Sequence, residues 1–256
     1  MNIPSHIPAP SKFWLAAEPR AVLESLSVLF NHNHLKDLPQ GKGAPVMVLP
    51  GLGTTDITTA PLRNFLKSIG YNPYGWGLGI NRGFKPEYEV KLLKRLRRIY
   101  LKYDQPVRLI GWSMGGIYAR EIAKIDSRVI NQVITMGSPF SGGKTQKTNV
   151  GTIYRILNGD RIDATHDSRA LHLHEAPPVP TTAIYSKTDG VVNWQYCIEY
   201  DDVDHTESIE VKGSHLGLGV NSMVWMILAD RLAQDPDNWH SFDNTKLKDV
   251  NHALLV

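Results

Sequence analysis

The chain has 256 residues, 42% of them hydrophobic and 21% charged, which is the composition of a globular protein long enough to bury a large core. Its formal net charge of +3 is small for this length and gives no reason to expect a nucleic-acid partner. The only cysteine, Cys197, excludes an intrachain disulfide, so we expect the apolar core alone to hold the fold.

No linker, low-complexity tract or internal repeat divides the sequence, and we therefore expect one domain over residues 1–256. Glu18, Arg20 and Glu24 interrupt the apolar stretch near the N-terminus, which is not the pattern of a secretory leader. No apolar run approaches the roughly 20 residues that are needed to span a bilayer. These features predict a soluble, cytoplasmic protein.

Residues 1–43 form an N-terminal extension with a Pro-rich start and a set of apolar side chains that can line one side of a helix. These side chains are Phe13, Trp14, Leu15, Val22, Leu23, Leu26, Leu29 and Phe30. We expect a helix that packs on the body of the domain through this apolar side. A dimer contact or an anchor at a lipid surface is the alternative.

From residue 45 onward, strand-like and helix-like segments alternate. Extended segments are expected at residues 46–49, 72–78, 107–110, 129–136, 181–185 and 208–211, and helices at residues 60–69, 87–103, 117–125 and 222–232. Residues 140–178 lose this alternation and become polar and irregular, so we predict a small cap insertion there. Repeated strand–helix units imply an α/β fold with a mostly parallel central sheet and helices on both faces.

The helix expected at residues 87–103 carries basic side chains interleaved with apolar ones at helical spacing. The basic residues are Lys91, Lys94, Arg95, Arg97, Arg98 and Lys102. We interpret this pattern as an amphipathic helix with a solvated outer face. An anionic partner or a lipid surface is the alternative.

The sequence GWSMGG at residues 111–116 lies between an expected apolar strand and an expected helix. In this context Gly-x-Ser-x-Gly is the pattern of a nucleophile elbow, a sharp turn that exposes its serine above the sheet. Gly111 and Gly115 lack the Cβ atoms that would clash in so tight a turn. We therefore predict that Ser113 is a nucleophile, with its oxygen at the start of a helix.

A serine hydroxyl is a weak nucleophile, so an imidazole must take its proton and a carboxylate must orient that imidazole. The elbow implies the chain order Ser, Asp, His. Asp189 directly follows an expected strand and precedes Gly190, whereas His215 follows the last expected strand. The rival His205 lies before that strand. We predict that Ser113, Asp189 and His215 form a catalytic triad.

Two backbone N–H groups are predicted to bind the oxyanion that forms during acyl transfer. One belongs to Met114, directly after the nucleophile, and the other to Leu52, in the loop after the first apolar strand. Gly51 and Gly53 allow this backbone to approach a substrate closely.

We predict no cofactor and no metal site. Histidines and a glutamate in the expected cap could share one face of an extended segment, but no further ligand pattern supports them. They are His166, His172, His174 and Glu175. Residues 77–79 read GLG and lack the third glycine of a dinucleotide fingerprint.

Over about residues 45–232 the sequence resembles the α/β-hydrolase superfamily of lipases, esterases and related acyl enzymes, and within it bacterial lipase-like serine hydrolases. The resemblance rests on the ordered motifs Leu-Pro-Gly-Leu-Gly, Gly-Trp-Ser-Met-Gly-Gly, Thr-Asp-Gly and Gly-Ser-His. Many such relatives have a histidine before the oxyanion-loop glycine, where this chain has Pro50. In relatives an apolar residue at the position of Leu52 often accompanies medium or long acyl chains.

The resemblance implies a carboxylesterase or lipase of lipid metabolism that hydrolyses a small-molecule ester or a lipid through an acyl-enzyme on Ser113. Transient contact with a lipid interface is a further expectation. Because the fold fixes neither the acceptor nor the leaving group, an acyltransferase, perhydrolase, thioesterase or amidase on the same triad is an alternative. A ligand-binding protein that keeps the fold without turnover is another. The sequence does not determine the oligomeric state.

Overall fold

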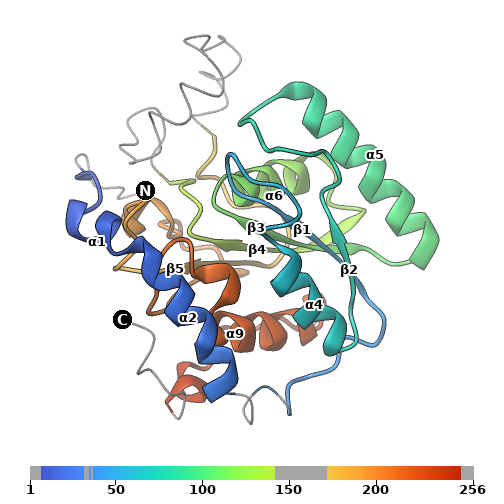
Figure 1. Cartoon of the computed structure of the whole chain (residues 1–256). Coiled ribbons are helices and arrows are strands. Elements are labelled where there is room, and N and C mark those ends of the chain that lie inside the picture. The colour runs from blue at the N-terminus through green and yellow to red at the C-terminus, as the bar shows by residue number, and fades with distance from the viewer. Residues whose placement is uncertain (1–6, 32–34, 36, 142–171, 249–256) are drawn as a thin grey trace.

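The computed structural model describes residues 7–31, 35, 37–141 and 172–248, and within them six strands form one sheet in the order β2-β1-β3-β4-β5-β6 (Figure 1). The strands are β1 (Pro45–Leu49), β2 (Asn72–Gly75), β3 (Val107–Trp112), β4 (Ile130–Met136), β5 (Thr181–Tyr185) and β6 (Thr206–Glu210). Every neighbouring pair is parallel, which confirms the predicted α/β architecture.

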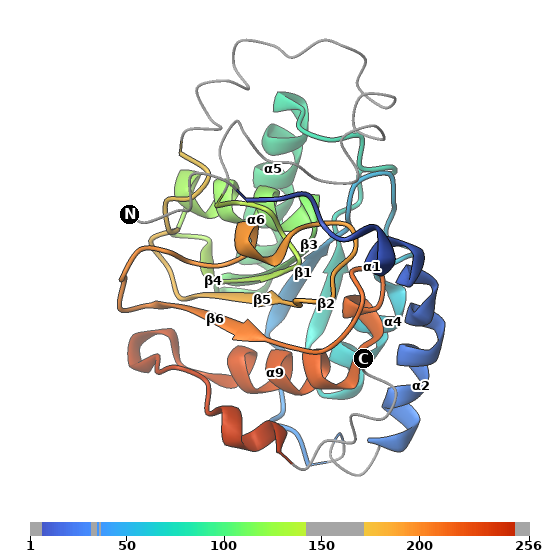
Figure 2. The ribbon, with the colours of Figure 1, turned by 90° about the vertical axis from the view of Figure 1, so that its left-hand side faces the viewer.

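Helices cover both faces of this sheet (Figure 2). The α-helices are α1 (Lys12–Ala16), α2 (Ala21–Phe30), α4 (Ala60–Ser68), α5 (Pro86–Tyr103), α6 (Met114–Ile125) and α9 (Ser222–Ala233). Short 3-10 helices are η1 (Glu18–Arg20), η3 (Trp194–Tyr196), η4 (Leu218–Val220), η5 (Pro236–Asn238) and η6 (Asn244–Leu247). None of the helices in the described ranges is long and apolar enough to cross a membrane.

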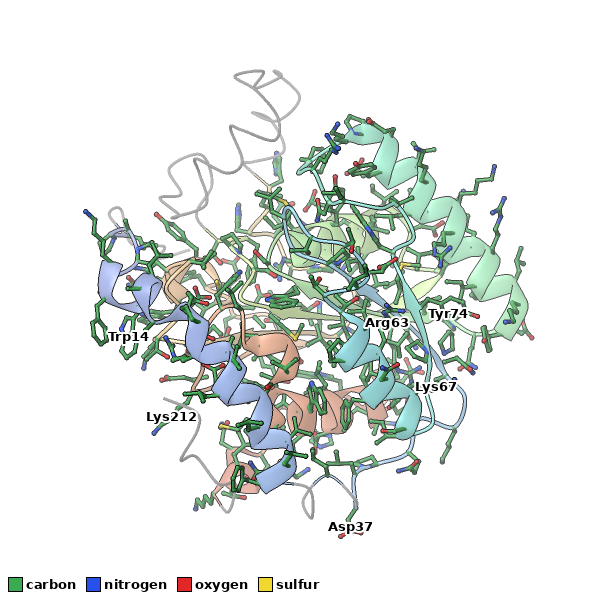
Figure 3. The ribbon with its side chains drawn as sticks, in the orientation of Figure 1. Trp14, Asp37, Arg63, Lys67, Tyr74 and Lys212 are labelled. Atoms are coloured by element: carbon green, nitrogen blue, oxygen red, sulfur yellow. The ribbon has the colours of Figure 1, made fainter. Side chains whose placement is uncertain are left out.

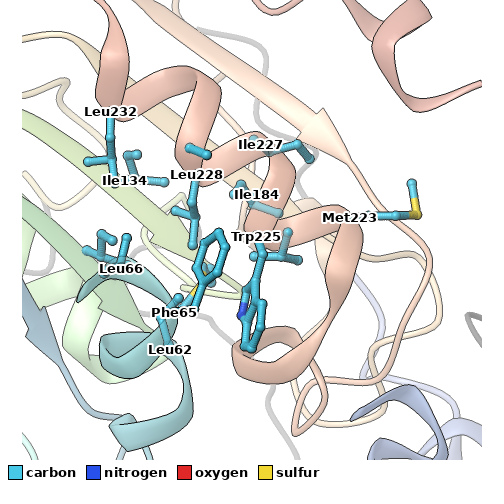
Figure 4. Close-up of a cluster of buried hydrophobic side chains, with 14 of the residues drawn as sticks. Leu62, Phe65, Leu66, Ile134, Ile184, Met223, Trp225, Ile227, Leu228 and Leu232 are labelled. Atoms are coloured by element: carbon cyan, nitrogen blue, oxygen red, sulfur yellow. The ribbon is translucent and has the colours of Figure 1, made fainter. Parts of the chain in front are cut away.

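Alternate residues of the central strands enter two different cores, one on each face of the sheet. Val46 of β1 packs with α4 and α9, whereas its neighbour Met47 packs with α5 and α6. In the first core Phe65 of α4 stacks on Trp225 of α9, with ring centroids 4.5 Å apart (Figure 4). Burial on both faces explains why these strands are continuous apolar runs in the sequence.

The boundaries of most elements agree with the sequence prediction to within a few residues. The strand β5 begins and ends as predicted, but β2 ends at Gly75 although the extended segment was expected to reach residue 78. The chain leaves the sheet there because the carboxylate of Asp56 accepts hydrogen bonds from the N–H groups of Trp76 and Gly77, both at 2.9 Å. Gly77 also has a φ of +74°, which ends the extended conformation.

The helix α5 has the amphipathic character that its sequence predicts. Leu92 and Leu96 are fully buried, whereas most of its basic side chains are exposed. A groove of about 450 Å³ runs along this basic face beside the segment that follows β2. The predicted cap insertion falls mainly on residues 142–171, which lie outside the described residues.

The N-terminal helices lie against the body of the domain, but their apolar side faces outward, so the prediction that they pack through that side is wrong. Phe13, Val22 and Leu29 are 70%, 73% and 71% exposed. The buried side chains of helices η1 and α2 are instead polar, namely Glu18, Glu24 and Ser27, and the two carboxylates are 4% and 0% exposed. The physical reason is hydrogen bonding, because both carboxylates accept N–H groups of loops that follow β5 and β6.

Candidate active site

Ser113 lies between β3 and α6 in a strained turn with φ of 53° and ψ of −123°. Non-glycine residues rarely adopt such dihedral angles, and strain of this kind gathers at functional sites. The N–H of Ser113 donates to the carbonyl of Met136 at 2.8 Å, and its own carbonyl accepts the N–H of Gly116 at 2.9 Å. The hydroxyl does not cap α6, so it stays available at the N-terminus of that helix.

Two glycines allow this turn to sit against the sheet. A Cβ atom at Gly111 would lie 2.2 Å from the Cα of Gly116. A Cβ at Gly115 would lie 2.3 Å from the carbonyl oxygen of Leu49, at the end of β1. Since real Cβ atoms do not approach other atoms so closely, any larger residue at either position would push α6 away from the strands.

Asp189 and His215 lie on loops that follow the neighbouring strands β5 and β6, and their side chains are hydrogen-bonded. The distance from Asp189 Oδ2 to His215 Nδ1 is 2.6 Å, and both residues are buried. The other carboxylate oxygen, Oδ1, accepts the N–H groups of Val191 and Val192 at 2.8 and 2.7 Å. Both oxygens are therefore used, which fixes the direction in which the carboxylate faces the imidazole.

Burial of the His215 ring disfavours its charged form, but the charge of Asp189, the hydrogen bond to it and the charge of Glu18 outweigh this effect. Together they raise the pKa of His215 above its ordinary value of 6.5. A base in this position is therefore stronger than a free imidazole.

The imidazole lies beside the serine turn. The carbonyl of His215 accepts a hydrogen bond from Trp112 Nε1 at 3.1 Å, and Trp112 directly precedes the serine. A Cβ at Gly137, after β4, would lie 2.9 Å from His215 Nδ1. Within the described ranges the Ser113 hydroxyl makes no hydrogen bond to the imidazole, a bond that often forms only once a substrate is bound.

The predicted oxyanion loop, residues 50–53, passes close to the serine. A Cβ at Gly51 would lie 3.4 Å from the Cβ of Ser113. Asn81 holds the loop in place, because its side chain donates to the carbonyl of Pro50 at 2.8 Å and its own carbonyl accepts the N–H of Gly53 at 2.7 Å. Both ends of this loop are therefore bound to Asn81.

The N–H groups of Leu52 and Met114 donate to no other described residue. Leu52 and Met114 are half-buried, and they lie in the loop next to Ser113 and at the first position of α6. An acyl-transfer oxyanion requires N–H donors that are not already paired, and these two N–H groups meet that requirement.

Sequence reasoning missed Glu18 and Glu24, which contact the loops that carry Asp189 and His215. The one available signal was that these two carboxylates interrupt an otherwise apolar helical segment. Because both carboxylates lie on the side of the helices opposite the apolar side chains, helical periodicity alone would place them in solvent, and only the structure shows that they are buried.

No protein-family model matches the chain. Among curated proteins, a segment of 109 residues is 28% identical to the 2-hydroxy-6-oxo-6-(2'-aminophenyl)hexa-2,4-dienoic acid hydrolase of Metapseudomonas resinovorans. The matched segment covers 40% of this chain and 38% of that protein, so the likeness extends over less than half of either.

Solved structures resemble the chain over most of its length. They include Bacillus licheniformis lipase BlEst2, with a TM-score of 0.55 and 16% identity over 77% of this chain and 94% of that one. Aspergillus fumigatus lipase B has a TM-score of 0.55 and 19% identity over 80% and 57% of the two chains. For the monoacylglycerol lipase of Paleococcus ferrophilus the TM-score is 0.51 and the identity 15%, over 75% and 96%. The chain has the α/β-hydrolase fold.

Proposed function

We propose that this protein is a serine hydrolase that cleaves carboxylic esters, with Ser113, Asp189 and His215 as its catalytic triad. The observation that carries the proposal is the buried hydrogen bond between Asp189 and His215 beside a strained serine turn. The fold, which is shared with lipases of known structure, supports the same class of reaction.

In the first half of the reaction, Ser113 Oγ attacks the carbonyl carbon of the ester while His215 Nε2 takes the hydroxyl proton. Asp189 keeps the other proton on Nδ1 and stabilises the imidazolium without becoming protonated itself. The negative charge moves to the carbonyl oxygen, where the N–H groups of Leu52 and Met114 would receive it. The bond to the leaving alcohol then breaks, and His215 returns its proton to the alcohol oxygen.

In the second half, a water molecule attacks the acyl-enzyme. His215 takes one water proton, and the oxyanion forms again at the same two N–H groups. The bond between the acyl carbon and Ser113 Oγ then breaks, and the proton passes from His215 to the serine. The enzyme returns to its starting state, and the products are one carboxylic acid and one alcohol.

The proposed substrate is a small-molecule ester or a lipid with a medium or long acyl chain. Leu52 supports this choice, because its apolar side chain is partly exposed in the loop next to Ser113. Contact with a lipid interface belongs to the same proposal. Residues 12–30 present apolar side chains outward, while their two carboxylates, Glu18 and Glu24, are turned inward.

Fluorophosphonate labelling of the wild type and of Ser113→Ala tests the proposal without knowledge of the substrate. We expect stoichiometric labelling of the wild type and none of the variant. On nitrophenyl esters, kcat of Ser113→Ala should fall by a factor on the order of 10⁶ if the triad acts as a unit. A loss of tenfold or less would reject Ser113 as nucleophile, and a wild type that does not label would favour a binding protein without turnover.

The acceptor and the leaving group are tested separately by product analysis. Competing alcohols, peroxide, thioesters and amides offered together with an ester would distinguish a hydrolase from an acyltransferase, a perhydrolase, a thioesterase or an amidase. We expect the free acid as the main product. A series of nitrophenyl esters tests the chain length, and a preference for short acyl chains would contradict the role proposed for Leu52.

A further inference from the structure

Glu18, in the 3-10 helix η1, joins the two loops that carry Asp189 and His215. Its Oε1 accepts the N–H of Gly190 at 2.8 Å and the N–H of His215 itself at 3.0 Å, and its Oε2 accepts the N–H of Leu216 at 2.9 Å. The side chain is 4% exposed. One buried carboxylate therefore binds the residue after Asp189 and the backbone of His215 at the same time.

Neighbouring side chains of the same segment contact the same two loops. Arg20 Nη2 donates to the carbonyl of Thr188 at 2.7 Å, directly before Asp189. Glu24 Oε1 accepts the N–H of Ser214 at 2.7 Å, directly before His215. Arg20 and Glu24 also form an ion pair at 3.3 Å, which links the two contacts.

The backbones are packed together closely along this contact. A Cβ at Gly190 would lie 2.3 Å from the carbonyl carbon of Trp14, so only glycine fits between Asp189 and α1. A Cβ at Gly217 would lie 1.7 Å from Glu24 Oε2. In Figure 3, Trp14 on α1 and Lys212, which follows β6, lie along the same side of the molecule, so the N-terminal helices run beside the histidine loop.

This contact explains why the N-terminal helices bury carboxylates and expose their large apolar side chains. Large apolar side chains face outward while two carboxylates are buried, which is the reverse of an ordinary surface helix. A buried carboxylate is tolerated when hydrogen bonds replace its water, and Glu18 accepts three. The segment is therefore oriented by its polar contacts with the two loops.

We propose that Glu18 is a positioning residue for the triad, because it binds the loops of Asp189 and His215 together and so keeps the imidazole in place beside Ser113. This inference rests on the proposed function, since it assumes that His215 acts as the base. It assigns to the N-terminal extension a role in the reaction, although none of the extension's described residues hydrogen-bonds the side chain of Ser113 or of His215.

The charge of Glu18 gives this role a measurable signature. The negative charges of Asp189 and of Glu18 both raise the pKa of His215. The other carboxylate near this loop, Glu24, accepts the N–H of Ser214, the residue before His215. Removal of the Glu18 charge should lower the pKa of His215 and shift the acid limb of the pH–rate profile to lower pH. A residue that only stabilised the fold would leave this limb where it is.

Glu18→Gln is the first test, because it keeps the size of the side chain but removes its charge and at least one of its three acceptor contacts. We expect fluorophosphonate labelling and kcat to slow by up to about 100-fold, as for a small displacement of catalytic groups, while KM changes little. The pKa of His215, followed by NMR titration, should fall.

Ser27→Ala is the matched control. Ser27 belongs to the same segment and is buried, but its Oγ accepts the N–H of Ser222 at 3.2 Å, at the start of α9 and away from the two triad loops. We expect this variant to label at the wild-type rate with an unchanged pKa of His215.

If Glu18→Gln does not fold, Glu18→Asp carries the test, because it keeps the charge and withdraws the carboxylate by one methylene. We expect slower labelling with the pKa of His215 close to that of the wild type. Wild-type rates and an unchanged pH profile in the folded Glu18 variant would overturn the proposal, as would equal slowing by Ser27→Ala. A wild type that does not label would instead refute the proposed function, whereas the NMR titration would still report whether Glu18 acts on His215.

Discussion

Asp189 Oδ2 and His215 Nδ1 lie 2.6 Å apart, although the two residues are separated by 26 positions in the chain and follow different strands. The relationship arises because β5 and β6 are parallel neighbours, so that the loops after both strands emerge at the same edge of the sheet. Since both residues are buried, water does not compete for this bond, and the pair depends on the loops that hold it.

Asp189→Asn should uncouple the imidazole from its partner. An amide cannot stabilise an imidazolium by charge, so we expect kcat to fall by about 10⁴-fold, the loss that such a change causes in a serine protease triad. The pKa of His215 should also fall, because attraction to Asp189 is a cause of its increase. The residual acid limb of kcat/KM should therefore lie at lower pH than in the wild type, for which we expect activity to rise as His215 loses its proton, at a pH above the ordinary pKa of 6.5. An acid limb at the wild-type position would contradict the assignment of Asp189.

Glu24 should make the stability of the protein depend on pH. Burial raises its pKa above 4.5, although hydrogen bonds from Ser214 and the charge of Arg20 act in the opposite direction. A carboxyl whose pKa is raised in the folded state binds its proton more tightly there than in the unfolded chain. Its contribution to stability is therefore complete below pH 4.5 and is lost as the pH rises through the folded-state pKa.

Glu24→Gln should remove this loss, because an amide does not titrate. We expect the free energy of unfolding of the wild type, relative to the variant, to decrease between pH 4.5 and neutrality, as measured by urea unfolding at several pH values. His215 also makes the free energy of unfolding depend on pH, at higher pH, because its pKa is raised. This effect is present in both proteins and cancels when they are compared. Parallel pH curves for the two proteins would show that Glu24 does not titrate in this window.

Glu199→Ala should destabilise the protein strongly. Glu199 forms a buried ion pair with Arg120 of α6, whose guanidinium also lies 3.7 Å from the ring centroid of Phe140. Removal of the carboxylate leaves a buried charge without its partner, which typically costs about 3–5 kcal/mol. Glu210→Ala is the control, because its pair with Lys187 is half exposed and water screens it. Equal losses in urea unfolding would show that burial of the Arg120 pair does not matter.

The serine turn and the sheet could be predicted from the sequence because both are encoded locally. Continuous apolar runs such as that at Val46 need no knowledge of distant residues, and the glycines around Ser113 reflect clashes within a single turn. Asp189 and His215 could be located from the sequence for a similar reason, because each follows an expected strand. The chain order of the elements then fixed the edge of the sheet at which they meet.

The orientation of the N-terminal helices could not be predicted, because it depends on partners far away in the chain. Helical periodicity identifies an apolar side but assumes that this side is the buried one. Here the N–H groups of Gly190 and of His215, which lies 197 positions after Glu18, donate to the Glu18 carboxylate. These bonds determine which side of the helices is buried. Every residue except proline has a backbone N–H group, so the sequence does not show which of these groups will be buried and will need an acceptor. Only the structure shows this.

The outward apolar face of the N-terminal helices leads to the last prediction, which concerns binding to a lipid surface. Val22 and Leu29 are 73% and 71% exposed, and neither carboxylate of the segment faces outward. Exposed apolar patches of this kind are typical of membrane or partner contacts. The helices that carry the patch contact the loops of the proposed triad through their opposite, inward side. A lipid surface bound there would lie on the outer side of the helices that hold the loops of the proposed triad.

The double variant Val22→Gln with Leu29→Gln should bind phosphatidylcholine vesicles more weakly, by about tenfold for each apolar side chain that no longer enters the lipid. Its rate on a dissolved short-chain ester should stay at the wild-type level, because both side chains face solvent and not the triad loops. The matched control, Val90→Gln with Leu101→Gln, removes two equally exposed side chains from α5, at 67% and 77% exposure. Since a general loss of hydrophobicity would affect both double variants alike, vesicle flotation that falls equally in the two would contradict a specific lipid contact at the N-terminal helices.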